Sequence, residues 1–341
     1  MTKSGPDTEI VIDSISPSLA IPGGDVKIVG HNFLDGVRPT VRIGGELAAL
    51  TAGSARLAIA RVPEQPGGGT LSVGLYPETW AEAPFEVGAL LAENLHPVAN
   101  PAVDAAGNIY ATFSGSRGQK TPVAIFRINA EGGMEPYLTE LMNATGLAFD
   151  SLGVLHVTSR FDGFVYQVPS SGVLNVFVEG MGVATGIAFD LEDNLYVGDR
   201  SGTIFKISPS RQVYVFATVE ASIAAFHLAF GPGGYLYVTG PTTSSNDVVH
   251  RISPAGEVEI FYRGLGRPQG LAFDADGNLY VAASLSGRRG IVKITPEAKA
   301  SLFLSGPNIV GLAFAPEGNM IVATSGSLYR AHTGIMGRPL V

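Results

Sequence analysis

The amino-acid sequence predicts an all-β protein of two domains, a small N-terminal β-sandwich and a C-terminal six-bladed β-propeller. A unit of two short strands joined by a turn recurs six times after residue 98, whereas residues 8–87 contain no copy of it. Glycine is abundant, with 44 residues, and charged residues make up only 15%, as is typical of many short strands joined by tight turns. We therefore expect a disordered start over residues 1–7, a sandwich over residues 8–87 and a propeller over residues 88–341.

The N-terminal segment alternates apolar and polar residues over short stretches separated by Pro-Gly-Gly and Gly-Gly turns, which favours antiparallel strands. Residues 15–18, 22–33 (PGGDVKIVGHNF) and 41–45 resemble the IPT/TIG family of immunoglobulin-like sandwiches. Residues 60–63 and 84–87 stand where that family has its last two strands. The resemblance implies a spacer or interaction module, and such a fold by itself assigns no activity.

Each C-terminal repeat begins with a small hydrophobic strand, passes through an acidic or glycine-rich turn and returns in a second strand. Third and fourth strands follow, for example residues 202–207 and 213–216, and complete a four-stranded blade. The residues that align the repeats are separated by 46, 40, 41, 43 and 41 positions. They are Val103, Phe149, Phe189, Phe230, Phe273 and Phe314. Six copies at this spacing predict six blades.

The last repeat has too little chain for a fourth strand, because its three expected strands already extend to residue 331. The stretch just before the first repeat, residues 88–93 (GALLAE), is the natural candidate to pair with it. Such pairing closes the ring and removes two exposed sheet edges.

Residues 268–282 (PQGLAFDADGNLYVA) resemble the NHL-repeat and gluconolactonase/strictosidine-synthase-like group of six-bladed propellers, and the resemblance extends over residues 89–341. For the lactonases of that group it implies one divalent cation, such as calcium, held in the channel by acidic and amide ligands. Gln269 stands where their acidic ligand is found, and the other pre-strand positions carry no carboxylate. We therefore expect no metal and no cofactor, with a calcium-type site as the alternative.

Aspartates recur in the turns between the first and second strands of the repeats. They could form a carboxylate constellation for acid–base chemistry, but Asp in such turns ordinarily bonds to its own backbone, and we favour that structural role. The chain also has no cysteine, no Gly-x-Ser-x-Gly elbow, no phosphate loop and no dinucleotide fingerprint. We therefore assign no catalytic residues. The turn carboxylates in question are Asp104, Asp150, Asp190, Asp274 and Asp276.

His227 occupies a position that is glycine in four other repeats, at the start of an innermost strand. Either it contacts a ligand or transfers a proton, or it is a packed histidine with a satisfied ring, and the second interpretation is favoured.

If the protein binds a ligand, the sequence places the site at the top of the channel, where the starts of the innermost strands meet loops from every blade. Amides, hydroxyls and imidazole both donate and accept hydrogen bonds, whereas arginines only donate, so the expected ligand carries acceptors or negative charge. The basic loops on this side could also be simply solvated. The expected ring is Asn100, Thr145, Thr185, His227 and Gln269, with Arg160, Arg200 and Arg288 around the rim.

The net charge of −8 argues against a general nucleic-acid partner, and no stretch approaches the 18 apolar residues that membrane insertion needs. The N-terminus lacks the features of a secretory signal, so a cytoplasmic location is the default expectation, with an extracytoplasmic one left open. Together these features favour a non-catalytic binding or scaffold protein for a small polar or anionic ligand or a protein partner. The alternative is a gluconolactonase-like, metal-dependent lactone or ester hydrolase with an atypical site.

Overall fold

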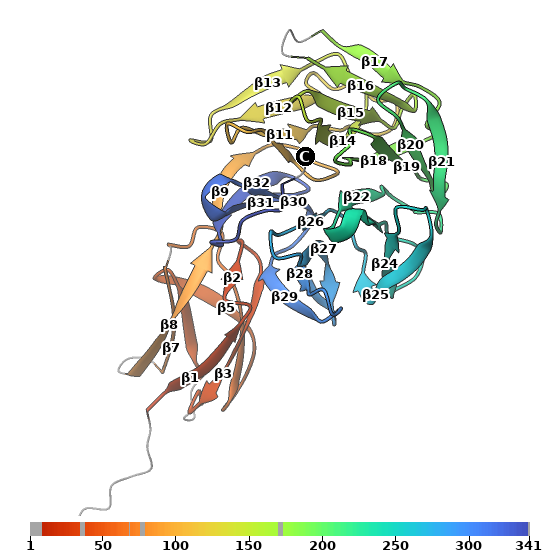
Figure 1. The fold of residues 1–341 in the computed structure, drawn as a ribbon. Coiled ribbons are helices and arrows are strands. Elements are labelled where there is room, and N and C mark those ends of the chain that lie inside the picture. Colours follow the sequence, from red (N-terminus) through yellow and green to blue (C-terminus); the bar gives the residue numbers. More distant parts are fainter. Residues whose placement is uncertain (1–8, 35–37, 68, 76–78, 170–172, 340–341) are drawn as a thin grey trace, which may run out of the picture. The chain divides into compact units, whose positions relative to one another are not determined.

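The computed structural model describes residues 9–34, 38–67, 69–75, 79–169 and 173–339, so the predicted disordered start, residues 1–7, lies outside the described residues. The chain divides into two compact units (Figure 1). One contains residues 1–89 with residues 288–290 and 302–307, and the other contains the rest of the chain. The described regular structure is all β apart from two 3-10 turns, η1 (Pro232–Gly234) and η2 (Pro316–Gly318). Among the described residues, no helix is long and apolar enough to cross a membrane.

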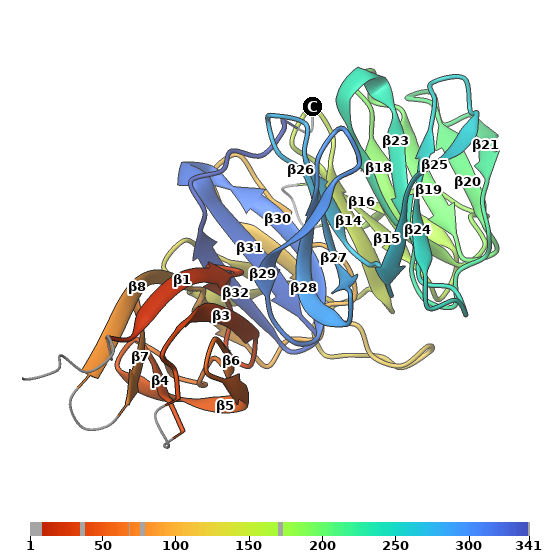
Figure 2. The same ribbon diagram turned by 90° about the horizontal axis from the view of Figure 1, so that it is seen from below.

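The N-terminal domain is a sandwich whose strands surround a common interior (Figure 2), and its strands pair antiparallel except for β2, which pairs with β8 in parallel. In its third strand the side chains alternate between interior and solvent, so Val26 and Ile28 are fully buried and pack in one cluster with Phe33 and Leu71. The strands hydrogen-bond in the order β1, β3, β6, β5, β4, β7, β8, β2. They are β1 (Val11–Ser16), β2 (Leu19–Ala20), β3 (Asp25–His31), β4 (Thr40–Ile43), β5 (Glu46–Ser54), β6 (Leu57–Arg61), β7 (Gly69–Leu75) and β8 (Thr79–Val87).

The second unit is a propeller-like arrangement of four-stranded antiparallel sheets, with β14, β18, β22, β26 and β30 nearest its centre (Figure 1). Three of the sheets consist of consecutive strands. They are β10 (Ala102–Val103), β11 (Ile109–Thr112), β12 (Ile125–Ile128) and β13 (Met134–Leu138), then β14 (Ala144–Phe149), β15 (Leu155–Ser159), β16 (Phe164–Val168) and β17 (Asn175–Val178), then β18 (Ala184–Phe189), β19 (Leu195–Asp199), β20 (Thr203–Ile207) and β21 (Val213–Thr218).

The next eight strands continue this pattern but belong to one longer hydrogen-bonded path, because β25 pairs with β27 through Leu265 opposite Leu285 and Gly266 opposite Ser284. The strands are β22 (His227–Phe230), β23 (Leu236–Thr239), β24 (Asp247–Ile252), β25 (Val258–Gly266), β26 (Leu271–Phe273), β27 (Leu279–Leu285), β28 (Arg288–Ile294) and β29 (Ala300–Ser305).

The last sheet has the composition that the sequence predicts. β30 (Ile309–Ala315), β31 (Asn319–Thr324) and β32 (Ser327–His332) are completed by β9 (Ala89–Glu93), which lies beside β32. The predicted pairing of the stretch before the first repeat with the last repeat is therefore confirmed. It joins strands more than 230 residues apart in sequence and covers the edge that β32 would otherwise present, so that β9 forms the outer edge of this sheet.

A repeated aromatic contact joins neighbouring sheets. A ring on the second strand of one sheet packs edge-on against the phenylalanine of the next innermost strand, with ring centroids 4.7–5.3 Å apart. Ile321 of β31 and Val103 of β10, which stand at the equivalent positions, belong to one hydrophobic cluster instead. The five aromatic pairs are Tyr110–Phe149, His156–Phe189, Tyr196–Phe230, Tyr237–Phe273 and Tyr280–Phe314.

Four of the predicted turn aspartates, Asp104, Asp150, Asp190 and Asp274, have the structural role that the sequence favours. One oxygen of Asp274 accepts the backbone N–H of Asn278 at 2.7 Å, and the other accepts the Asn278 amide at 2.8 Å and the Tyr280 hydroxyl at 3.2 Å. Asp104 and Asp190 make the same bonds. These carboxylates are therefore occupied in closing turns.

Candidate functional site

A cavity of about 390 Å³ lies on the axis of the propeller-like unit. It is lined by the innermost strands β10, β14, β18, β22, β26 and β30 and by residues 336–338 of the C-terminal segment. This volume is within the range of roughly 300–1,000 Å³ that small-molecule pockets usually have.

Apolar side chains dominate the lining, with one alanine and one phenylalanine from most of the innermost strands. Four polar side chains contribute, those of Asn100, Asp104, His227 and Arg338. The Asp104 carboxylate already accepts the backbone N–H groups of residues 106 and 108, the Asn108 amide and the Tyr110 hydroxyl. The cavity therefore differs from the polar ring that the sequence predicts.

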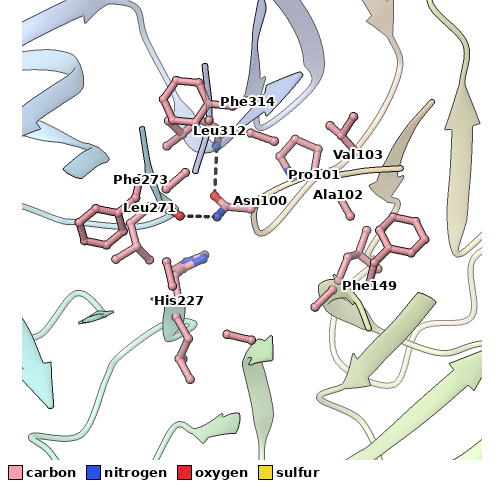
Figure 3. Close-up of a pocket in the computed structure, with 18 of the residues that line it drawn as sticks. Asn100, Pro101, Ala102, Val103, Phe149, His227, Leu271, Phe273, Leu312 and Phe314 are labelled. Carbon is pink, nitrogen blue, oxygen red and sulfur yellow. Dashed lines mark hydrogen bonds between the residues drawn. The ribbon is translucent and has the colours of Figure 1, made fainter. Parts of the chain in front are cut away.

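Asn100 connects two innermost strands across one end of the cavity (Figure 3). Its amide Nδ2 donates to the Leu271 carbonyl at 2.8 Å, and its Oδ1 accepts from the Leu312 N–H at 3.1 Å. The contact needs a glycine beside it, because a Cβ atom at Gly270 would lie 1.9 Å from Asn100 Oδ1. One of the two amide hydrogens of Asn100 remains for another acceptor.

His227 lies at the same end of its strand and directs its ring toward the space between the innermost strands (Figure 3). Its side chain is only 4% exposed, and within the described part of the chain its ring makes no hydrogen bond. Burial lowers the pKa of His227 to about 4, so the imidazole is neutral at neutral pH. A neutral imidazole offers one donor and one acceptor, and in the cavity both lack a protein partner.

The predicted threonines are buried, but their hydroxyls bond to nearby backbone groups and neither residue lines the cavity. Thr145 Oγ1 donates to the Asn143 carbonyl at 3.0 Å. Thr185 Oγ1 donates to the Gly198 carbonyl at 3.1 Å and accepts the Phe226 N–H at 3.0 Å. Thr185 therefore ties its own sheet to the next one.

Gln269 also lies outside the lining. Its backbone N–H donates to the Ala282 carbonyl at 2.8 Å, and its carbonyl accepts from the Thr239 hydroxyl at 2.6 Å. Gln269, where the family resemblance places an acidic ligand, is thus held by bonds of its backbone within and between sheets.

The three predicted rim arginines each donate to a backbone carbonyl. Arg160 Nη2 bonds to the Gly115 carbonyl at 2.6 Å, and Arg200 Nη2 bonds to that of Ile223 at 3.1 Å. Arg288 belongs to the first unit, where its Nη2 bonds to the Ser16 carbonyl at 2.6 Å. Burial lowers the pKa of Arg160, and the positive charges of Arg200 and Arg117 lower it further, so these three form a basic group. Of the eight predicted residues, only Asn100 and His227 line the cavity.

The donor set does not fit a divalent cation. Among the described residues, no group of three or more His, Asp or Glu side chains is placed to hold a metal. Within the cavity, Asp104 is occupied by its turn and Asn100 Oδ1 by the Leu312 N–H. A calcium site would need several free oxygen ligands there.

The C-terminal segment closes part of the other end of the cavity. Met336 accepts the Ala275 N–H through its carbonyl at 2.9 Å, and the Arg338 N–H donates to the Phe273 carbonyl at 2.9 Å. The starts of the innermost strands are buried, whereas Met336 in the C-terminal segment is 56% exposed. The end beside this segment, although partly covered by it, is therefore the more open end of the cavity. The sequence analysis missed residues 336–338, because their glycine- and proline-rich surroundings indicate only that strand structure ends there.

Comparisons with known proteins agree with this architecture. Residues 11–82 match the IPT/TIG domain family. No curated protein sequence matches the chain significantly.

Several solved structures share the fold at low sequence identity. An auxiliary nutrient binding protein from Bacteroides thetaiotaomicron is 13% identical, with a TM-score of 0.56, and the match covers 98% of this chain and 99% of that one. A gluconolactonase from Xanthomonas campestris is 13% identical, with a TM-score of 0.59 and coverage of 71% and 88%. Virginiamycin B lyase from Staphylococcus aureus is 13% identical, with a TM-score of 0.53 and coverage of 71% and 96%.

Because these neighbours have different activities, the likeness shows the fold and leaves the function to the residues of the site. Residues 11–82 are an IPT/TIG domain, and the chain as a whole is an all-β protein with structural neighbours among gluconolactonase-type propellers.

Proposed function

We propose that the chain is a non-catalytic binding protein whose small-molecule ligand occupies the cavity on the axis of a six-bladed propeller. The observation that carries this proposal is His227, a buried imidazole without a hydrogen-bond partner among the described residues, aimed into a cavity of about 390 Å³. Its ring nitrogens face the cavity without a protein partner, so a ligand in the cavity can form hydrogen bonds with both of them.

Six blades of the NHL-repeat type are supported by the strand pattern. Strands β22–β25 and β26–β29 each repeat the four-strand order of the separate sheets, and both contribute an innermost strand to the cavity lining. The aromatic contact between neighbouring sheets also recurs across these two sets, as Tyr237–Phe273 and Tyr280–Phe314.

Binding is favoured over catalysis because the polar groups of the cavity do not form a reactive set. His227 lies in the cavity without a bonded carboxylate to orient its ring, and Asp104 is committed to its turn. A general base ordinarily needs such an orienting partner and a pKa near the working pH.

Gluconolactonase-like hydrolysis is the second candidate, and the fold likeness to a gluconolactonase is what favours it. It requires a divalent cation that the donor set does not hold. The Arg160, Arg200 and Arg117 group could still attract an anionic partner to the loops, which would be a scaffold function independent of the cavity.

The proposal is tested with N-phenyl-1-naphthylamine, an uncharged apolar probe whose fluorescence rises in a dry site. We expect saturable binding at one site per chain, and loss of that binding in the cavity-filling variant Ala272→Leu. Ala275→Leu, the same exchange at an exposed turn residue outside the cavity, is the matched control and should leave binding unchanged. Equal binding by both variants would place the probe elsewhere and overturn the proposal.

The second candidate function, lactone hydrolysis, is tested separately. Elemental analysis of the purified chain and an aldonolactone assay with added calcium, zinc or manganese should show no stoichiometric metal and no chelator-sensitive turnover. Robust turnover would replace binding by catalysis as the function.

A further inference from the structure

The closed end of the cavity combines two unused hydrogen-bonding groups with an apolar wall, and this combination restricts the ligand. Asn100 donates one amide hydrogen to the Leu271 carbonyl, and its second amide hydrogen remains available. Neither ring nitrogen of His227 bonds to a described residue, and burial lowers its pKa so that the imidazole is neutral. Figure 3 shows both side chains near the apolar residues Leu271 and Leu312.

Charge on a ligand group at this end would be unfavourable. The lining there offers no carboxylate and no cationic group, because Asp104 is satisfied by its turn and Arg338 lies with the C-terminal segment at the other end. An ion moved from water into such an apolar site loses its hydration without gaining a partner charge.

From these groups we infer that the ligand is an uncharged, mainly apolar molecule that carries one hydroxyl group, and that this hydroxyl bonds to His227 and Asn100 at the closed end. The inference rests on the proposed binding function and specifies its ligand class. A hydroxyl donates one hydrogen bond and accepts others, so it can donate to the imidazole acceptor while accepting the free amide hydrogen of Asn100. The alanine and phenylalanine wall would contact the apolar body of the molecule.

Three naphthalene probes of similar size and different polarity test the ligand class: 2-naphthol, 2-methylnaphthalene and 2-naphthoate. Their dissociation constants are measured on the full chain at pH 7 by titration calorimetry. We expect 2-naphthol to bind about tenfold more tightly than 2-methylnaphthalene, since one net hydrogen bond corresponds to about that factor. We expect 2-naphthoate to bind at least about tenfold more weakly than 2-naphthol, because its charge must be desolvated.

Two variants connect the preference to the imidazole. His227→Phe should bring the ratio between 2-naphthol and 2-methylnaphthalene close to one, while the affinity for 2-methylnaphthalene stays within about threefold of the native value. His227→Gln keeps a donor and an acceptor and should retain part of the preference. Because the glutamine variant keeps polar groups at the site, it provides the test even where the phenylalanine variant fails to fold.

The outcomes separate the ligand class from the proposed function. Equal affinity for all three probes, or tightest binding of 2-naphthoate, would overturn the hydroxyl inference and leave small-molecule binding in place. A native preference for 2-naphthol that survives in both His227 variants would also overturn it. Failure of all three probes together with N-phenyl-1-naphthylamine would overturn the proposed function itself.

Discussion

The two ends of the innermost strands differ in how they use their side chains. At the starts, glycines allow neighbouring sheets to approach so closely that a Cβ atom at Gly146 would lie 2.4 Å from the Thr185 carbonyl oxygen. At the ends, phenylalanines pack edge-on against rings of the preceding sheet, and aspartates close the turns. Most polar groups at both ends are therefore occupied by the fold. The groups left over for a ligand are those where one repeat departs from the others, and His227 is the clearest case.

Backbone crowding at the strand starts should give the largest effect. In Gly270→Ala the new Cβ would lie 1.9 Å from Asn100 Oδ1 and 2.6 Å from the Gly311 Cα, so a strand has to move. We expect a loss of roughly 4 kcal/mol in the free energy of unfolding, measured by urea denaturation.

The matched exchange at the opposite end is Gly153→Ala. Gly153 has a φ of +72° but no neighbour within 4 Å of an added Cβ, so only backbone strain opposes the change. Its cost should be about 1 kcal/mol. Equal losses in the two variants would show that the starts of the strands are not the more crowded end.

His227 should make stability depend on acid. Its pKa is about 4 in the folded chain and ordinarily near 6.5 in the unfolded chain, so only the unfolded chain gains its proton between these values. The contribution of neutral His227 is complete above about pH 6.5 and is lost progressively as the pH falls toward 4. The free energy of unfolding should drop by roughly 2–3 kcal/mol more in the native chain than in His227→Gln between pH 7.5 and 4.5.

His156 and His250 also have pKa values lowered by burial, so the native chain loses further stability in acid that both proteins share. The difference between the native chain and His227→Gln isolates the one imidazole. Parallel stability curves for the two proteins would contradict the burial of the His227 imidazole.

Asn100 gives the third effect in size. Asn100→Ala leaves the Leu271 carbonyl and the Leu312 N–H without their side-chain partner, and we expect a loss of about 2 kcal/mol by urea denaturation. Asn108→Ala, at the turn end, removes a half-exposed amide bonded to Asp104 and should cost about 1 kcal/mol. A larger loss at Asn108 would reverse the comparison between the two ends.

The difference between the ends also explains what the sequence could and could not predict. The repeat and the closing strand β9 follow from periodicity, because each blade needs four strands and the last repeat lacked one. The position of a residue along a strand does not reveal where its side chain points. Thr145 and Thr185 were therefore predicted to line the cavity, although their hydroxyls bond to nearby backbone groups. The segment at 336–338 has no period, and its place at the cavity depends on backbone bonds that leave no pattern in the sequence.

The smallest effect should come from the turn end, where Tyr280 donates to Asp274 at 3.2 Å. Tyr280→Phe keeps the edge-on contact with Phe314 and removes only the hydroxyl, while Asp274 keeps its bonds to Asn278. We expect a loss of about 1 kcal/mol, because one hydrogen bond to a charged acceptor is removed and the acceptor stays largely satisfied. Tyr196→Phe removes the equivalent bond to Asp190 and should cost the same within about 0.5 kcal/mol if the turns are interchangeable repeats of one design. Burial and the adjacent carboxylate raise the pKa of both tyrosines, so absorbance titration should show both ionising above the usual range for tyrosine. A loss at either tyrosine as large as that of Gly270→Ala would mean that the turn end, rather than the crowded start, holds the blades together.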